Sequence, residues 1–148
     1  MRFWLAVLTL VGLDQLTKWA VTVFLTRGES VPLIPGVLWL THARNPGAAF
    51  NLFPGHGAAL VMVTLIVIAV AVAFHRRLLD LGLGLPLALI LSGGLGNLLD
   101  RLRLGQVIDF LDLRFWPVFN LADVYISLGA ILIVLATLRG SGRGGAGA

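Results

Sequence analysis

Residues 120–138, NLADVYISLGAILIVLATL, decide the class of fold because they contain an apolar run of membrane-spanning length. A bilayer core about 30 Å thick requires roughly 20 mostly apolar residues in a helix. Asp123 is the one charged side chain in this run. We therefore expect a membrane helix that carries a carboxylate in its first turn, and a charged group in that position is a functional hypothesis by default.

The composition of the whole chain agrees with a membrane protein. Of its 148 residues, 58% are hydrophobic and 12% are charged, and the mean hydropathy is +0.96. Soluble domains average about 25% charged residues. The net charge is +4, but the arginines are scattered over helix ends and loops, so we expect no nucleic-acid partner. The chain has no cysteine, which excludes disulfides, thiol nucleophiles and thiolate metal sites.

Four segments have the length and hydropathy of membrane helices: residues 3–25, 57–74, 81–99 and 121–138. An even number of spans places both termini on one side of the membrane. The arginines in the short connections divide five against five between the two sides, and the adjacent Arg76 and Arg77 favour cytoplasmic termini. We expect residues 1–138 to form one membrane-embedded domain and the Gly-rich residues 139–148 to be a disordered tail.

The two connections on the side opposite the termini contain most of the polar and aromatic residues that lie outside the helices. Residues 31–53 interleave β-branched and aromatic residues with Pro and Gly, which predicts short strands at the membrane surface. Residues 100–120 include Phe110, Phe115 and Trp116, which suit an interfacial aromatic belt. The predicted fold class is therefore an all-α integral membrane protein with four transmembrane helices and a small extracytoplasmic β-rich region.

Polar residues inside the predicted helices need partners, because each costs about 2.5–3.5 kcal/mol at the middle of a membrane helix. Asp14 and Lys18 are four residues apart, so their side chains share one helix face and can neutralise each other. A structural ion pair that positions the first helix is the favoured interpretation. A direct part in chemistry stays open.

The segment SGGLGNLLDR, residues 92–101, predicts a close helix contact and a polar cluster. Its three glycines permit another backbone to approach, as small residues do between membrane helices. Asn97 and Arg101 share one face, and Asp100 lies beside them. A helix end that meets water through an Asp–Arg pair remains the alternative. A dinucleotide site is excluded because no strand precedes the glycines.

Two further acids, Asp109 and Asp123, are the candidates for catalysis. Asn120 already occupies an N-cap position before the last helix, so capping alone does not require Asp123. Asp109 lies between Ile108 and Phe110, and burial there would raise its pKa. If the two carboxyl groups meet around a water molecule, the pair keeps one proton and supplies both an acid and a base for hydrolysis of an amide. Such a site needs no metal or cofactor.

Other chemistries and other protein classes fit less well. The three histidines are isolated from one another, and the chain contains no HExxH, GxSxG or SxxK spacing, which argues against zinc and serine hydrolases. A small transporter could use the same acids as an ion pathway, although transporters commonly contain internal repeats and none is detectable here. An assembly factor would have little use for two interfacial acids. The residues alone leave membrane hydrolase and transporter open.

Five short blocks, in this order along the chain, resemble the lipoprotein signal peptidase family, signal peptidase II. They are DQLTK at 14–18, RNPGAAF at 44–50, GGLGNLLDR at 93–101, VIDF at 107–110 and FNLADVYI at 119–126. The resemblance spans the chain from Asp14 to about residue 138. It implies an aspartic endopeptidase of the bacterial plasma (inner) membrane, with both termini cytoplasmic. Such an enzyme cleaves the signal peptide from diacylglyceryl-modified prolipoproteins immediately before the lipidated cysteine.

The resemblance also assigns roles to individual residues. Asp109 and Asp123 would be the catalytic pair. The motif positions that would support the site or contact the substrate are Asp14, Lys18, Asn45, Gly47, Asn97, Arg101, Asn120 and Ala122. The family's extracytoplasmic β-cradle would correspond to residues 31–53, membrane lipid would be a partner, and globomycin-type antibiotics would block the site. The segment between Asp109 and Asp123 is shorter than in many members of the family, which affects the expected shape of the flap over the substrate.

Overall fold

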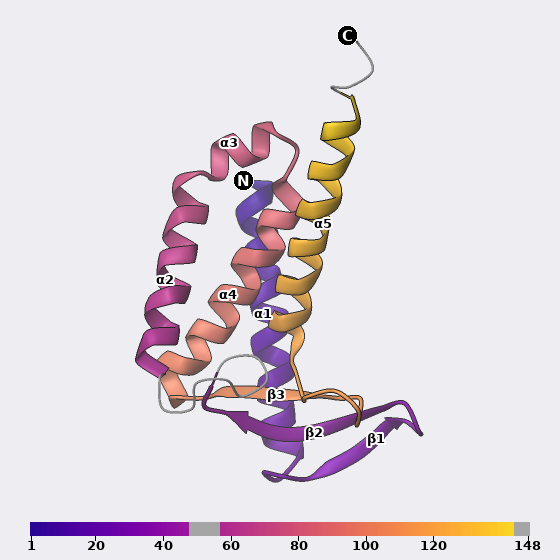
Figure 1. Cartoon of the computed structure of the whole chain (residues 1–148). Helices are drawn as coiled ribbons and strands as arrows, with labels where there is room; N and C mark the ends of the chain where they lie inside the picture. Colours follow the sequence, from indigo (N-terminus) through magenta and orange to yellow (C-terminus); the bar gives the residue numbers. More distant parts are fainter. Residues whose placement is uncertain (48–56, 144–148) are drawn as a thin grey trace.

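The computed structural model describes residues 1–47 and 57–143. Four helices run side by side, and a small sheet lies across one end of them (Figure 1). The helices of this bundle are α1 (Arg2–Phe24), α2 (Gly57–Ala73), α4 (Gly84–Leu104) and α5 (Leu121–Arg143). The short helix α3 (His75–Asp80) connects α2 to α4 at the end opposite the sheet, where the N-terminus also lies (Figure 1).

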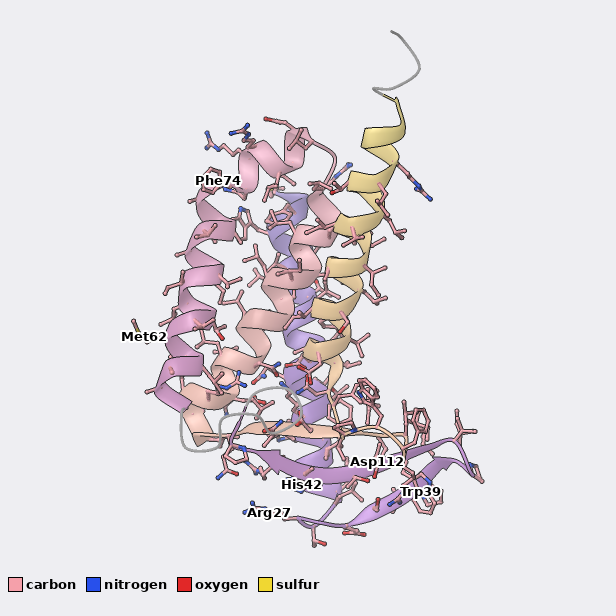
Figure 2. The ribbon with its side chains drawn as sticks, in the orientation of Figure 1. Arg27, Trp39, His42, Met62, Phe74 and Asp112 are labelled. Atoms are coloured by element: carbon pink, nitrogen blue, oxygen red, sulfur yellow. The ribbon has the colours of Figure 1, made fainter. Side chains whose placement is uncertain are left out.

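Three of these helices are long and apolar enough to cross a membrane: Arg2–Phe24, Gly84–Leu104 and Leu121–Arg139. The apolar part of α2, Ala58–Ala73, is shorter. Large apolar side chains are exposed along the outside of the bundle, and Met62 on α2 points away from the other helices (Figure 2). An apolar exterior of this kind suits contact with lipid, because lipid tails do not penalise exposed hydrocarbon.

Two helix boundaries differ from the sequence-based prediction. The predicted helix 81–99 begins at Gly84 and continues to Leu104, because the residues after 99 remain helical until Gly105 ends the helix in the left-handed conformation with φ 69°. The predicted disordered tail is wrong for residues 139–143, since α5 continues to Arg143. Residues 144–148 of that tail lie outside the described part of the chain.

The sheet has three antiparallel strands in the order β1 (Ser30–Ile34), β2 (Leu38–Asn45) and β3 (Val107–Asp112). Strands were predicted within residues 31–53. β2 and all of β1 except Ser30 fall there, whereas residues 48–53 lie outside the described residues. The third strand was not predicted. Its register pairs Ala43 with Asp109, so β2 and β3 bring two distant parts of the sequence to the end of the bundle.

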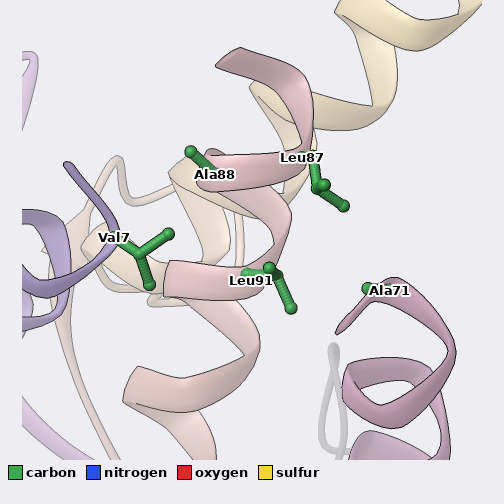
Figure 3. Close-up of a cluster of buried hydrophobic side chains, with 5 residues drawn as sticks. All are labelled: Val7, Ala71, Leu87, Ala88 and Leu91. Atoms are coloured by element: carbon green, nitrogen blue, oxygen red, sulfur yellow. The ribbon is translucent and has the colours of Figure 1, made fainter. Parts of the chain in front are cut away.

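The helix core is built around α4, which packs against α1, α2 and α5. Figure 3 shows five buried apolar side chains from α1, α2 and α4, namely Val7, Ala71, Leu87, Ala88 and Leu91. Glycines allow α4 to approach its neighbours closely, as predicted. A Cβ on Gly93 would overlap the carbonyl of Ala122 in α5, and one on Gly96 would overlap the carboxylate of Asp14 in α1. Close packing at small residues is one of the forces that associate helices in lipid.

Candidate active site

The polar side chains of the bundle gather at the end nearest the sheet, and Asn120 joins the two candidate acids there. Asp109 is carried by β3, and Asp123 lies in the first turn of α5. The Asn120 amide donates to Asp109 Oδ1 at 2.6 Å. Its Oδ1 accepts from the Asp123 N–H at 3.0 Å. One buried side chain therefore bonds to the carboxyl group of Asp109 through its amide nitrogen and to the backbone of Asp123 through its oxygen.

Asp123 and Asn120 cap α5 reciprocally. The Asn120 side chain accepts from the Asp123 N–H, and the Asp123 Oδ2 accepts from the Asn120 N–H at 3.3 Å. The sequence-based view that Asp123 is not needed for capping is therefore incomplete. Asp123 Oδ1 faces Asn97 instead, whose amide donates to it at 2.8 Å. Asp123 thus caps α5 through Oδ2 and bonds to Asn97 through Oδ1.

Asp109 is 3% exposed and accepts hydrogen bonds from two amides. Asn120 donates to one carboxylate oxygen, and the side chain of Asn45 on β2 donates to the other at 3.0 Å. Burial raises the pKa of Asp109 to about 6, and the nearby charge of Asp123 adds to the rise, while the two amides act in the opposite direction. The charge of Asp123 therefore acts on Asp109, and the raised pKa lets Asp109 hold a proton up to about pH 6.

Lys18 lies at the base of this cluster with 1% of its surface exposed. Its ammonium group is 2.9 Å from Asp14 Oδ2 and 3.0 Å from Asp100 Oδ2, so the predicted Asp14–Lys18 pair extends to a third charge. Lys18 also donates to Asn97 Oδ1 at 3.0 Å. Because an ammonium group can only donate, it fixes the Asn97 amide so that its nitrogen points at Asp123. Lys18 thereby orients a direct partner of a candidate acid.

Asp14 connects the first helix to the start of the last one. Its Oδ1 accepts from the backbone N–H of Ala122 at 3.0 Å, and Ala122 is fully buried. Its Oδ2 bonds to Lys18 and also accepts from Gln15 at 3.2 Å. The Ala122 N–H is one of the unpaired donors in the first turn of α5, so Asp14 satisfies it from another helix.

Arg101 and Gly47 form a second support, beside Asn45. Arg101 donates to the carbonyl oxygen of Gly47 at 3.1 Å, and the Gly47 N–H donates to the Asn45 Oδ1 at 2.9 Å. The bond from Gly47 determines the direction of the Asn45 amide, whose nitrogen is then directed at Asp109. The guanidinium of Arg101 is thus tied to the residues that hold Asp109.

A cavity of about 640 Å³ opens beside the acids, between α2, α4 and α5. Its polar end contains Asp109, Asp123, Asn97 and Arg101. The remaining lining is mostly apolar and comes from α2, α4, α5 and the segment before α5, including Val63, Val67, Ile90, Phe119, Val124 and Leu128. This form suits a ligand with a long apolar part and a reactive group at one end.

Comparisons with known proteins identify the family. A family model described as signal peptidase (SPase) II matches residues 6–139. The chain belongs to the signal peptidase II family. A lipoprotein signal peptidase of Pelotomaculum thermopropionicum is 48% identical over 145 residues, covering 94% of this chain and 91% of the relative. A second, of Moorella thermoacetica, is 44% identical over 147 residues and covers 98% of both chains.

The fold agrees with membership of the signal peptidase II family. A solved structure described as "Bacterial membrane enzyme structure by the in meso method at 2.3 A resolution" superposes with a TM-score of 0.91. It is 31% identical, and the match covers 96% of this chain and 90% of that one. The resemblance inferred from five short sequence blocks is therefore confirmed. Family membership also decides for a membrane peptidase over the transporter that the residues alone had left open.

The structure brings all ten residues singled out by the signal peptidase II motifs to one end of the bundle. Hydrogen bonds or ion pairs join them directly or through one another. The histidines lie elsewhere: His42 is on β2 and His75 is on α3, while His56 is outside the described residues. Within the described ranges, no group of three or more His, Asp or Glu is arranged to hold a metal ion.

Two members of the cluster were not assigned to the site from the sequence. Asp100 was interpreted as either part of a polar cluster or the solvated end of a helix, but it is buried, pairs with Lys18 and accepts from the Ile108 N–H at 3.1 Å. It therefore fixes the start of β3, which carries Asp109. Gln15 donates to Asp14, Asp100 and the Gly96 carbonyl. The available signals were its position directly after Asp14 in a membrane helix and its place within the block DQLTK.

Proposed function

We propose that this member of the signal peptidase II family is an aspartic endopeptidase that removes the signal peptide from diacylglyceryl-modified prolipoproteins. Cleavage would occur immediately before the lipidated cysteine. The observation that carries the proposal is the pair Asp109 and Asp123, joined by Asn120 at the polar end of a largely apolar cavity. The relatives that cover nearly the whole chain are lipoprotein signal peptidases, which supports this substrate class.

The two acids take different roles because their surroundings differ. Asp109 has the raised pKa and acts as the acid. Asp123 accepts N–H bonds from Asn97 and from the backbone of Asn120 at the start of α5, where the helix dipole favours negative charge. It acts as the base. Two carboxyl groups that share one proton and lie in different surroundings can serve as the acid and the base of a hydrolysis.

The reaction returns the pair to its starting state. The Asp123 carboxylate removes a proton from a water molecule as the water oxygen attacks the scissile carbonyl carbon, and Asp109 gives its proton to the carbonyl oxygen. The resulting diol then collapses: Asp123 donates its proton to the amide nitrogen, Asp109 takes one back from a hydroxyl group, and the C–N bond breaks. Asp109 and Asp123 are the two protein groups that exchange protons with water and the substrate in these steps.

The apolar walls of the cavity favour a substrate that enters from the lipid. Val63 and Val67 on α2 and Val124 and Leu128 on α5 line it, so acyl chains or apolar signal-peptide residues can lie against them. The scissile bond would then reach the carboxylates at the membrane surface, where water is also present. A membrane-embedded substrate does not have to leave the bilayer before cleavage.

We also propose that α2 is a fourth span and that both termini are cytoplasmic. A helix of 17 residues such as α2 is about 26 Å long at 1.5 Å per residue, close to the thickness of the bilayer core. Arg76 and Arg77 on α3 lie at the end that also holds the N-terminus, which favours that side as the cytoplasmic one (Figure 1). The sheet and the acids would then be extracytoplasmic.

The test is cleavage of a purified prolipoprotein, followed by its shift on a gel. The substrate is prepared with and without the diacylglyceryl group, and each form is incubated with the detergent-solubilised protein, with globomycin and with EDTA. We expect cleavage of the lipidated form, inhibition by globomycin and full activity in EDTA. Equal cleavage of the unlipidated form would contradict the substrate assignment, and loss of activity in EDTA would contradict the two-carboxylate mechanism.

A further inference from the structure

A second cavity, of about 210 Å³, lies where the end of α1, strand β2 and the α4–β3 turn meet. Its lining residues are Arg27, His42, Arg44, Leu104 and Gln106, and none of them lines the larger cavity beside the acids. Arg27 and His42 lie together at the sheet end of the molecule (Figure 2). The cavity is about seven times the roughly 30 Å³ that one water molecule occupies in the liquid, so a tetrahedral anion with some of its hydration fits.

The charge in this cavity is positive. Neither the Arg27 nor the Arg44 guanidinium has an ion pair among the residues that the structure describes. Glu29 is the acid closest in sequence to Arg27, and its carboxylate already accepts from the N–H and the hydroxyl group of Thr26, each at 2.8 Å. Two guanidinium groups at one cavity are suited to phosphate, which they bind through paired N–H donors.

His42 supplies an independent indication of a ligand. Its side chain is 5% exposed, and its Nδ1 lies 2.9 Å from the carbonyl oxygen of Leu25. Because a carbonyl oxygen only accepts, Nδ1 carries the hydrogen. In the described part of the chain, Nε2 is buried and has no hydrogen-bond partner. A buried polar atom without a partner is unfavourable. With the hydrogen on Nδ1, Nε2 can only accept, so the group that would satisfy it is a donor beside the phosphate, such as a hydroxyl group of a glycerol headgroup.

The position of the cavity indicates which kind of phosphate-bearing molecule could bind in it. Phe24 ends α1 and Leu104 ends α4; both side chains are exposed, and Leu104 lines the cavity. Both helices are long and apolar enough to span a membrane, so their ends lie at the level of the lipid headgroups. A lipid could therefore place its headgroup in the cavity while its acyl chains follow these apolar helix ends into the bilayer.

We propose that this second cavity binds the phosphate group of an anionic membrane lipid. Arg27 and Arg44 supply the positive charge, and His42 and Gln106 supply the neutral polar contacts. A lipid held there would fix the sheet against the membrane surface. The binding is separate from cleavage, because it uses none of the residues around Asp109 and Asp123.

The test compares lipid binding by the wild-type chain and by the double variant Arg27→Gln, Arg44→Gln. Phosphatidylglycerol is titrated into the detergent-solubilised protein, and the bound lipid is counted by native mass spectrometry. Loss of charge-assisted hydrogen bonds predicts a dissociation constant on the order of tenfold higher, or more, in the variant. Arg103→Gln is the matched control, because Arg103 is an exposed arginine at the same end of the bundle and does not line the cavity.

Two further arms separate the possible ligands. Phosphatidylcholine carries a phosphate but no net charge, and we expect the wild type to bind it more weakly than phosphatidylglycerol. Inorganic phosphate is added alone and as a competitor, and binding of phosphate without binding of the lipid would assign the cavity to a free anion. His42→Asn, which keeps a donor for Leu25 but loses Nε2, should also weaken retention of the lipid. Equal phosphatidylglycerol affinity in the wild type and the double variant would overturn the proposal.

Discussion

At the scale of single residues, Asp109 differs from Asp14 and Asp100 because it forms no ion pair with any residue that the structure describes. Asp14 and Asp100 contact Lys18, whereas Asp109 is held by the neutral amides of Asn45 and Asn120. Amide donors stabilise a carboxylate less than a salt bridge does, and burial dominates the balance. Asp109 is therefore suited to carry the proton of the pair at the pH of the membrane surface.

The raised pKa of Asp109 predicts how cleavage depends on pH. The protonated fraction of Asp109 falls as the pH rises through about 6, so kcat/KM should decline above that pH by about tenfold for each pH unit. This decline is measured from initial cleavage rates between pH 4.5 and 8.5. Binding of the lipidated substrate is checked at each pH. A rate that stays constant from pH 6 to pH 8.5 would show that no protonated carboxyl group is required.

Removal of Lys18 should chiefly affect stability. Lys18→Ala leaves Asp14 and Asp100 buried without their cation, and breaking a buried ion pair in this way costs about 3–5 kcal/mol. We expect a lower yield and a much lower midpoint of thermal unfolding in detergent. Thr22→Ala, one turn further along α1, is the control, because Thr22 is only partly buried and its hydroxyl group bonds only to the Trp19 carbonyl of its own helix among the hydrogen bonds that the structure describes. A Lys18→Ala protein with unchanged thermal stability and no activity would contradict this structural role.

At the scale of helices and strands, Gly96 is a point of close approach between α4 and the Asp14 side chain of α1. A methyl group there would overlap the Asp14 carboxylate, which bonds to Lys18 and to the N–H of Ala122. We expect Gly96→Ala to lower the midpoint of thermal unfolding and the cleavage rate together. Gly12→Ala is the matched control, because a Cβ at Gly12 on α1 meets no atom within 4 Å. A Gly96→Ala protein as stable and active as the control would show that this close approach is not required.

The sequence predicted the helices better than the strands for a physical reason. An apolar run of about 20 residues can form few structures other than a membrane helix. The N-terminal ends of α1 and α5 were therefore predicted within a few residues. Residues 107–112, VIDFLD, form a short and almost wholly buried strand without the polar–apolar alternation that marks a half-exposed one. Helix α3 has six residues, too few to give a periodic signal. Both elements depend on tertiary contacts.

The sequence indicated which polar residues need partners, but it did not indicate which partners they take. Asp109, Asp123 and Asn97 were found because a polar side chain in an apolar segment is expensive and needs a partner. Which partner it takes is set by the packing of distant helices, and the link from Lys18 through Asn97 to Asp123 joins α1, α4 and α5. Nothing in the local sequence indicated that Asp100 would share Lys18 or bond to Ile108.

At the scale of the whole molecule, the bundle places an apolar cavity against lipid and a polar cluster at its end. Val63 on α2 lines the cavity, whereas its neighbour Met62 does not and points away from the bundle (Figure 2). Val63→Trp should obstruct entry and raise KM for the lipidated prolipoprotein severalfold or more, while Met62→Trp should leave KM near the wild-type value. Steady-state kinetics in detergent micelles provide the comparison. Equal KM values for the two variants would argue against access between α2 and α5.

The measurement that tests the central proposal most directly is the turnover of Asp109→Asn and of Asp123→Asn on a diacylglyceryl-modified prolipoprotein. Asp112→Asn, on the same strand as Asp109, serves as the control, and thermal unfolding verifies that all three variants are folded. Loss of general acid–base catalysis should reduce turnover on the order of 10³-fold or more in each dyad variant and leave the control mostly active. Near-normal turnover by either folded dyad variant would contradict the two-carboxylate mechanism.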